Sequence, residues 1–288
     1  MSNGQLFKNA LKKNKPLIIP GAINAYSAML AEKAGHKAIY LSGSGVAAAS
    51  YGIPDLGFTS LEDVLTDVKR ITQSTQLPLL VDIDTGWSDT STITKTIKEM
   101  ENAECAAVHI EDQISSKRCG HRPNKKIVTV EKMLDRLKEA VDARQDKDFF
   151  IIARTDALAS EGIDSAIERC FEYVRHGADG IFLEAVQSID EYINFKNKLD
   201  IPLLANITEF GKTPLFKTSD LNNAGVDMVL YPLTAFRAMS KASETVYNSL
   251  FKEGTQENLL DIMQTREELY EVLDYYNFEK KLDEKYSD

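Results

Sequence analysis

The sequence predicts an α/β fold, a (β/α)8 barrel of the TIM type, and three observations support that class. Eight short apolar segments recur along the chain, amphipathic stretches with helical spacing separate most of them, and a polar or glycine-containing turn follows each segment. Eight buried strands joined by right-handed helical crossovers are what a closed parallel barrel requires. An open doubly wound sheet is the main alternative.

The expected strands lie within eight segments, which are 16–22, 37–43, 78–84, 106–112, 149–156, 180–186, 202–208 and 227–233. Between them, stretches such as 61–71 and 133–141 place apolar residues at the spacing of a helix with one buried face. The open-sheet alternative is weaker because no G-x-G-x-x-G motif follows the first strand, and "LSGSG" contains too few glycines for that fingerprint.

Two more helices are expected after the eighth strand, at 234–252 and 265–285, and the second carries the apolar residues Leu269, Val272, Leu273, Tyr276 and Leu282. A barrel does not need this last helix, so its apolar face must be buried against its own barrel or against a partner subunit. No linker rich in Pro or Gly is present. We therefore predict one barrel domain over residues 1–288, with residues 255–288 as a C-terminal helical extension.

Composition excludes several classes of protein. The 288 residues carry a formal net charge of −10, which gives no general attraction to nucleic acid or to anionic lipid. No apolar run approaches the roughly 18 residues of a membrane span, and no signal peptide is evident, so a cytoplasmic protein is expected. Three cysteines and four histidines show no disulfide or zinc spacing, so any metal should have oxygen ligands.

Side chains alternate along a strand, and this alternation separates residues that face the barrel interior from residues that face the helices. In each segment the inward set begins apolar and ends polar, which is how a barrel core becomes an active site at the carboxyl ends of its strands. The segment at 37–43 contributes Tyr40 and Ser42. The other inward sets end in Asp82, Asp84, His109, Glu111, Arg154, Asp156, Glu184, Asn206 and Thr208.

Carboxylates outnumber Arg154 in this inward set, and such an excess is costly unless a cation neutralises it. All-oxygen ligands suit Mg²⁺, with Mn²⁺ as a substitute, and we expect Asp82 and Asp84 to be the ligands. The alternatives are that single carboxylates cap loops and that His109 is a buried core residue rather than a ligand. No lysine ends an inward set, which argues against a Schiff-base aldolase.

The stretch "SKRCGHRPNK" at 116–125 places Cys119 and Gly120 among cations, namely Lys117, Arg118, His121 and Arg122. Positive charge on a flexible segment fits closure over a polyanionic substrate held near the metal. A solvated basic loop is the alternative.

Several motifs together resemble the isocitrate lyase and phosphoenolpyruvate mutase superfamily, and within it the 2-methylisocitrate lyases. These motifs are "IYLSGSGVAA", "VDIDTG", "KRCGHRPNK", "ARTDALA", "NITEFGKTPLF", "YPLTAFRAM" and "MQTREELYE", and they span nearly the whole chain. The resemblance implies a barrel whose eighth helix swaps between paired subunits, usually in a homotetramer, which would explain the extra C-terminal helix. It also implies cleavage of 2-methylisocitrate, a small polycarboxylate, to pyruvate and succinate in the methylcitrate cycle of propionate catabolism.

Carried over by position, the resemblance implies that Asp82 and Asp84 hold Mg²⁺ while Asp55 and Glu111 assist through water. It assigns the loop thiol of Cys119 as the general acid that protonates the carbanion, and Tyr40 is a guess for the base. The implied substrate-binding residues are Ser42, Gly43, Ser44, Cys119, Gly120, Arg154, Glu184, Asn206, Ile207, Thr208, Arg237 and Arg266.

The sequence departs from the family pattern at two places, which puts the outer shape of the pocket in question. Gly86-Trp87-Ser88-Asp89 follows the Asp pair where relatives have Gly, an aromatic residue and Gly, and Ser44 stands where close relatives often have Gly. Alternatives within the superfamily are an isocitrate lyase, a phosphonate-forming mutase and an oxaloacetate or dimethylmalate lyase. Outside it, the alternatives are a non-catalytic barrel and a zinc hydrolase.

Overall fold

The structure is a computed structural model that describes residues 1–87, 90–115 and 125–286. The chain forms two compact units, Met1–Thr234 and Ala235–Asp288. The second unit begins before residue 255, where the sequence analysis placed the start of the extension. The organisation as one domain with an extension stays a prediction.

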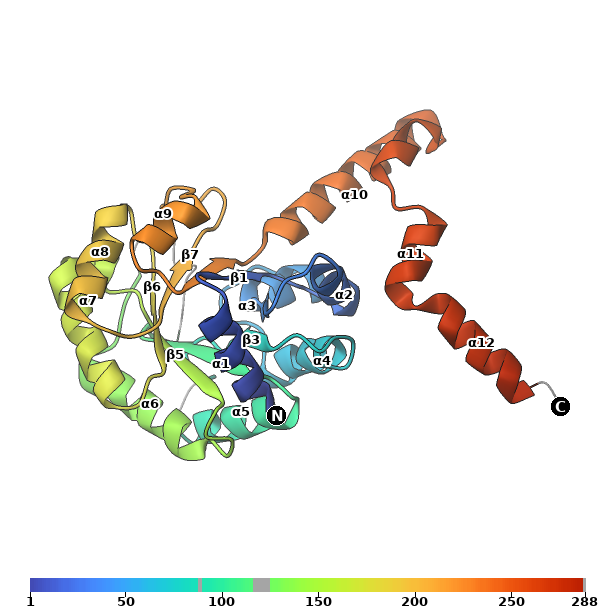
Figure 1. The fold of residues 1–288 in the computed structure, drawn as a ribbon. Helices are drawn as coiled ribbons and strands as arrows, with labels where there is room; N and C mark the ends of the chain where they lie inside the picture. The colour runs from blue at the N-terminus through green and yellow to red at the C-terminus, as the bar shows by residue number, and fades with distance from the viewer. Residues whose placement is uncertain (88–89, 116–124, 287–288) are drawn as a thin grey trace. The chain divides into compact units, whose positions relative to one another are not determined.

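Eight parallel strands form one sheet in the order β1-β8-β7-β6-β5-β4-β3-β2, and helices surround it (Figure 1). The edge strands β1 and β2 meet through a bridge between Gly21 and Tyr40, so the barrel is nearly closed. Each strand lies inside a predicted segment, which confirms the (β/α)8 class. The strands are β1 (Leu17–Pro20), β2 (Ile39–Leu41), β3 (Leu79–Asp82), β4 (Ala107–Glu111), β5 (Phe150–Thr155), β6 (Gly180–Leu183), β7 (Leu203–Asn206) and β8 (Met228–Tyr231).

Helices cover the outside of the barrel, and several begin with side-chain caps. Asn24, Ser60 and Ser188 each form a capping box, in which the side chains of the first and fourth residues satisfy free backbone N–H groups. The helices of this unit are α1 (Asn3–Lys13), α2 (Ala25–Lys33), α3 (Gly43–Gly45), the π-helix η1 (Val46–Ser50), α4 (Leu61–Thr72), α5 (Thr90–Asn102), α6 (Val130–Ala143), α7 (Leu158–Arg175), α8 (Ile189–Lys198) and α9 (Thr218–Asn223).

Two apolar clusters confirm the alternation that the sequence predicts. The cluster inside the barrel contains the inward residues Tyr40, Leu80, Ala107, Ile152, Phe182 and Leu204. The alternate residues, such as Val81, Val108 and Ile181, belong to a second cluster between the strands and the helices. Helix α1, which the sequence analysis did not predict, adds Phe7 and Leu11 to the interior cluster. The barrel is thus filled at its amino end and polar at its carboxyl end.

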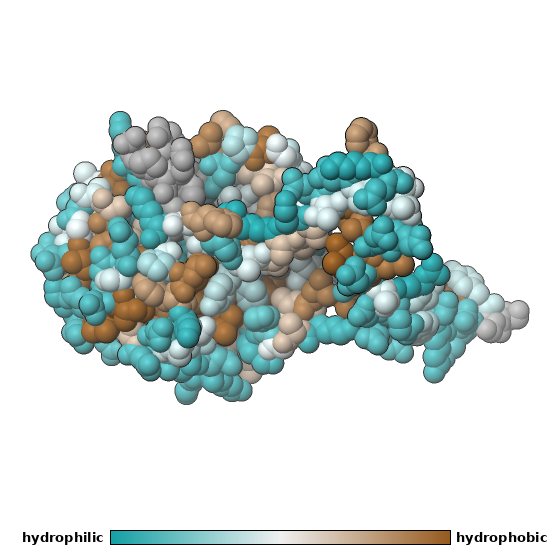
Figure 2. Space-filling view, turned by 90° about the horizontal axis from the view of Figure 1, so that it is seen from above, coloured by the Kyte–Doolittle hydropathy of each residue, from teal (hydrophilic) through white to brown (hydrophobic). Residues whose placement is uncertain are grey.

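The second unit is helical and contains all of α10 (Thr234–Glu253) except its first residue, followed by the 3-10 helix η2 (Glu257–Ile262), α11 (Arg266–Leu273) and α12 (Tyr275–Tyr286). The single helix predicted at 265–285 is therefore wrong, because Asp274 adopts a left-handed conformation with φ of 53° and ends α11. The apolar residues Leu273, Tyr276 and Leu282 are exposed. Figure 2 shows hydrophobic residues at the surface among a mainly hydrophilic covering. No helix in the described ranges has the length and apolar character to cross a membrane.

Candidate active site

Asp82 ends β3, and its carboxylate lies beside Gly43, the first residue of α3. The Gly43 N–H donates to Asp82 Oδ2 at 3.3 Å, and the Asp84 N–H donates to Asp82 Oδ1 at 3.0 Å. A Cβ atom placed on Gly43 would lie 3.3 Å from Asp82 Oδ2 and 3.6 Å from Asp84 Oδ1. Both carboxylates therefore border the space that the missing side chain leaves open.

The turn after β3 explains how the second carboxylate reaches this position. Asp84 has φ of 50°, a left-handed conformation that aspartate tolerates better than most residues, and its carbonyl accepts the Glu111 N–H at 2.9 Å. Gly86 has φ of 82°, and a Cβ there would lie 2.4 Å from Ile93. Only glycine fits at residue 86, so the "DIDTG" sequence fixes the path that places Asp84 beside Asp82.

His109 lies on β4, directly beside Asp82 in the strand register, and is fully buried. Its Nε2 atom is 2.9 Å from the Tyr40 hydroxyl and 3.6 Å from Asp82 Oδ1. Burial, and then the negative charge of Asp82, raise the pKa of Tyr40 well above its usual value. The phenol therefore stays protonated at neutral pH, which does not suit the role of general base.

Arg154 on β5 lies among three carboxylates. Its Nε atom donates to Asp156 at 2.9 Å and lies 3.2 Å from Glu111, and one terminal nitrogen is 3.4 Å from Glu184. The guanidinium carbon also lies 5.0 Å from the centre of the Phe182 ring. Burial lowers the pKa of Arg154, but the charges of Asp156, Glu111 and Glu184 outweigh burial and raise it overall. The guanidinium is therefore a permanent cation in a negative site.

The remaining predicted residues of the barrel unit divide into two groups. Asn206 Nδ2 donates to Glu184 Oε2 at 3.4 Å, and Ser42 and Thr208 are buried at the same carboxyl ends of the strands. The Ile207 side chain belongs instead to the cluster between strands and helices, so only its backbone faces the strand ends. Ser44 is half-buried in α3, and Asp55 is half-buried in the loop after η1.

Four predicted residues are not located in the barrel site by the structure. Arg237 lies on α10 and Arg266 is the first residue of α11, both in the second unit. Cys119 and Gly120 lie outside the described residues. Their roles stay predictions.

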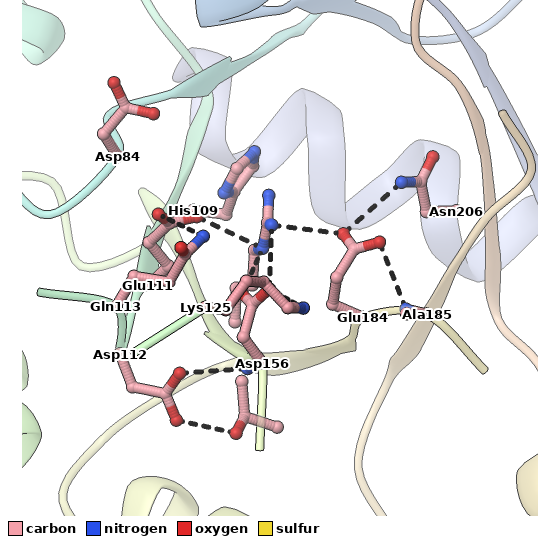
Figure 3. Close-up of polar contacts among 12 residues, drawn as sticks. Asp84, His109, Glu111, Asp112, Gln113, Lys125, Asp156, Glu184, Ala185 and Asn206 are labelled. Atoms are coloured by element: carbon pink, nitrogen blue, oxygen red, sulfur yellow. Dashed lines mark hydrogen bonds and ion pairs between the residues drawn. The ribbon is translucent and has the colours of Figure 1, made fainter. Parts of the chain in front are cut away.

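The sequence analysis missed residues that complete the site. The buried Lys125 amine contacts Asp156 Oδ1, and Gln113 donates to Glu111 Oε1 at 3.0 Å. Asp112 lies behind Asp156 and accepts its backbone N–H at 2.9 Å (Figure 3). Lys125 is the last residue of the cationic stretch at 116–125 and contacts a buried carboxylate, so charge balance could have indicated it. Asp112 has outward parity, which hid it from a search of inward residues.

A divalent metal fits the donors beside Gly43. Asp82 and Asp84 offer carboxylate oxygens on two sides of one open space, which suits Mg²⁺ with its remaining positions filled by water and substrate oxygens. In the described part of the chain, no three His, Cys, Asp or Glu side chains gather as a metal-binding group.

Comparisons with known proteins show which family the chain belongs to. Residues 7–251 match the phosphoenolpyruvate phosphomutase family. The chain is 57% identical to a 2-methylisocitrate lyase of Salmonella typhimurium over 286 residues, which cover 99% of this chain and 97% of the relative. It is 56% identical to the 2-methylisocitrate lyase of Escherichia coli over 283 residues, 98% of this chain and 96% of the relative.

A crystal structure of 2,3-dimethylmalate lyase, described as a member of the PEP mutase/isocitrate lyase superfamily, has a similar fold. It superposes with a TM-score of 0.90 at 30% identity, covering 99% of this chain and 95% of that chain. Similarity in sequence and similarity in fold thus both extend over almost the full length of the chain.

Proposed function

Because the chain belongs to the phosphoenolpyruvate phosphomutase family of the isocitrate lyase superfamily and is a carbon–carbon lyase, we propose that it cleaves 2-methylisocitrate to pyruvate and succinate. The proposed place of the reaction is the methylcitrate cycle of propionate catabolism. The substrate follows from the names of the relatives at 56–57% identity.

One observation carries the proposal from the structure. Five carboxylates are buried together at the carboxyl ends of the strands, and Arg154 and Lys125 form ion pairs with Glu111, Asp156 and Glu184 among them. The other two are Asp82 and Asp84. Such an excess of negative charge is costly in a protein interior unless a cation neutralises it. A site of this kind suits a metal-dependent reaction of an anionic substrate.

We propose that Asp82 and Asp84 hold Mg²⁺, with Asp55 and Glu111 bound through water. When bound, Mg²⁺ lowers the pKa of a coordinated hydroxyl group and stabilises the negative oxygen that forms during cleavage. Gly43 leaves the open space between the two carboxylates, so its lack of a side chain belongs to this arrangement.

The chain's own residues would bind and orient the substrate. Arg154 is a fixed cation and can bind one substrate carboxylate, and Asn206 at the end of β7 and Thr208 just after it can donate hydrogen bonds. Glu184, held by the Ala185 N–H at 3.1 Å, would lie beside the bound substrate. These contacts hold the carboxylates of the leaving succinate while the carbon–carbon bond breaks.

The carbanion that cleavage leaves on succinate must receive a proton, and we propose the Cys119 thiol as its donor. This assignment rests on the family resemblance of "KRCGHRPNK". Tyr40 is not assigned as the base, because its raised pKa favours the protonated phenol.

A homo-oligomer is also part of the proposal, a tetramer built from dimers that exchange C-terminal helices. Its support is the exposed apolar surface of α11 and α12, which includes Leu273, Phe278 and Leu282.

The direct test is turnover of the purified protein with 2-methylisocitrate and, in parallel, with isocitrate, each with and without a chelator. We expect cleavage of 2-methylisocitrate that the chelator abolishes and added Mg²⁺ restores. Preference for isocitrate, or equal activity with chelator, would contradict the proposal. Cys119→Ala should abolish cleavage while Mg²⁺ binding survives, and substantial activity of that variant would exclude the acid role.

A further inference from the structure

Asp112 lies one residue beyond Glu111 and points to the outer side of the barrel, behind the candidate site (Figure 3). Both of its oxygens accept hydrogen bonds. Oδ1 accepts the Asp156 backbone N–H at 2.9 Å, and Oδ2 accepts the hydroxyl groups of Thr155 at 2.7 Å and Tyr173 at 3.0 Å. One buried carboxylate therefore joins the end of β5 to α7.

Helix α7 holds this carboxylate from a firm base. Arg169 and Tyr173 lie one turn apart on α7, and one Arg169 nitrogen is 3.8 Å from Asp112 Oδ2. Arg169 is itself fixed by two hydrogen bonds of 2.8 Å to Glu161 and by the carbonyl of Val128 at 3.0 Å. Burial, and then the charge of Asp156, raise the pKa of Asp112 above its usual value. Burial of the Asp112 carboxylate costs free energy. Its hydrogen bonds offset this cost and also hold the carboxylate in one position.

The side chain of Asp156 connects Asp112 with the candidate active site. Its two oxygens accept from Arg154 Nε at 2.9 Å and from a terminal nitrogen at 3.3 Å, and Oδ1 also contacts Lys125. Arg154 is within 3.4 Å of Glu184 and 3.2 Å of Glu111 as well. Asp156 accepts hydrogen bonds from two nitrogens of the guanidinium, so a shift of Asp156 should change the direction in which the guanidinium points.

We propose that Asp112 is a positioning residue that acts through Asp156 to aim the Arg154 guanidinium at a substrate carboxylate. The inference rests on the proposed function for the identity of the substrate. It assigns Asp112 no contact with that substrate. Loss of Asp112 should therefore weaken substrate binding and leave Mg²⁺ binding in place.

Graded variants test the role. Asp112→Ala removes both acceptor oxygens and with them all three hydrogen bonds. Asp112→Asn keeps one oxygen for the Asp156 N–H, and the two hydroxyl groups can turn to accept from its amide. We expect KM for 2-methylisocitrate to rise about 30-fold or more in Asp112→Ala and about 5-fold in Asp112→Asn, with a smaller change in kcat. The Mg²⁺ dissociation constant, measured by calorimetry without substrate, should stay within about 2-fold.

Asp227→Asn is the matched control. Asp227 also accepts a backbone N–H and lies near cations, but it precedes β8 at the opposite end of the barrel. It should lose stability without a change in KM. Addition of Asp112→Asn to Asp156→Asn should change kcat/KM by less than about 2-fold, because both variants act on one element.

A wild-type KM in Asp112→Asn, the same KM change in Asp227→Asn, or additive effects with Asp156→Asn would overturn the inference. Failure of the proposed function would appear separately, as absence of turnover in the wild-type protein. In that case the dissociation constant of succinate, measured by calorimetry, replaces KM in the same set of variants.

Discussion

At the amino end of the barrel, Asp179 and Asp227 directly precede β6 and β8. Asp179 accepts the Ile151 N–H of β5 at 3.0 Å and an Arg144 nitrogen at 2.6 Å. Asp227 accepts the Leu203 N–H of β7 at 3.0 Å and the amines of Lys196 at 3.1 Å and Lys15 at 2.9 Å. Each carboxylate thus has a cation of its own and joins two neighbouring strands.

At the carboxyl end, carboxylates crowd around few cations. Asp156, Glu111 and Glu184 share Arg154, and Asp82 accepts the backbone N–H groups of Gly43 and Asp84. Buried carboxylates therefore stabilise the amino end of the barrel, whereas their crowding at the carboxyl end is unfavourable. The carboxylates at the amino end join neighbouring strands, and we propose that those at the carboxyl end serve a metal ion and a substrate instead.

The largest effect should follow from Asp82→Ala, which removes one of the two carboxylates beside Gly43. We expect kcat/KM to fall at least about 1,000-fold, because a metal that stabilises the transition-state charge is lost. Steady-state kinetics with calorimetric Mg²⁺ titration measures this. Wild-type Mg²⁺ affinity in the variant would contradict the assignment of Asp82.

Arg154→Met tests how much the carboxyl end depends on its shared cation. It leaves Glu111, Asp156 and Glu184 buried without their common partner, so the free energy of unfolding should fall by about 3–5 kcal/mol. Urea denaturation measures the change. A loss no larger than that of a surface substitution would show that this charge network does not hold the barrel together.

Asp227→Asn tests the amino end. Burial raises the pKa of Asp227, but hydrogen bonds from Lys15, Leu203 and Lys196 outweigh it and lower the pKa overall. A carboxylate with a lowered pKa stabilises the fold above the unfolded pKa of about 4, and this contribution disappears as pH falls through the folded pKa. The variant should lose about 1–3 kcal/mol at pH 7 and differ little from wild type in strong acid, with unchanged kcat/KM.

The smallest effect, with the opposite sign, is expected for Asp84→Asn in metal-free protein. Removal of one negative charge from the carboxylate excess should leave the Tm unchanged or raise stability by up to about 1 kcal/mol, while activity falls. Thermal unfolding in chelator measures it. A clear decrease in Tm would show that Asp84 serves the fold as Asp179 and Asp227 do.

Periodicity predicted the barrel and much of its site, because alternation in buried strands decides which side chains face inward. The pair Asp82 and Asp84, Arg154 and Glu184 were all recognisable in this way. Residues that reach the site from distant parts of the chain were not recognisable in this way. Lys125 reaches Asp156 from a loop, and Asp112 has outward parity, so neither follows a strand pattern.

The helical elements show a similar limit. Helix α1 fills the barrel with only Phe7 and Leu11, too few residues for a strong periodic signal. The apolar pattern at 265–285 continues through the break at Asp274, because hydrophobic spacing does not report a single left-handed residue.

If the buried carboxylates at the carboxyl end of the barrel hold Mg²⁺, the Tm of the protein should depend on the Mg²⁺ concentration. An ion that binds only the folded protein raises the Tm as the concentration of the ion increases. We expect added Mg²⁺ to raise the Tm of the wild type and of Asp227→Asn, and to leave the Tm of Asp82→Asn unchanged. An equal rise in Asp82→Asn, or no rise in wild type, would contradict the account.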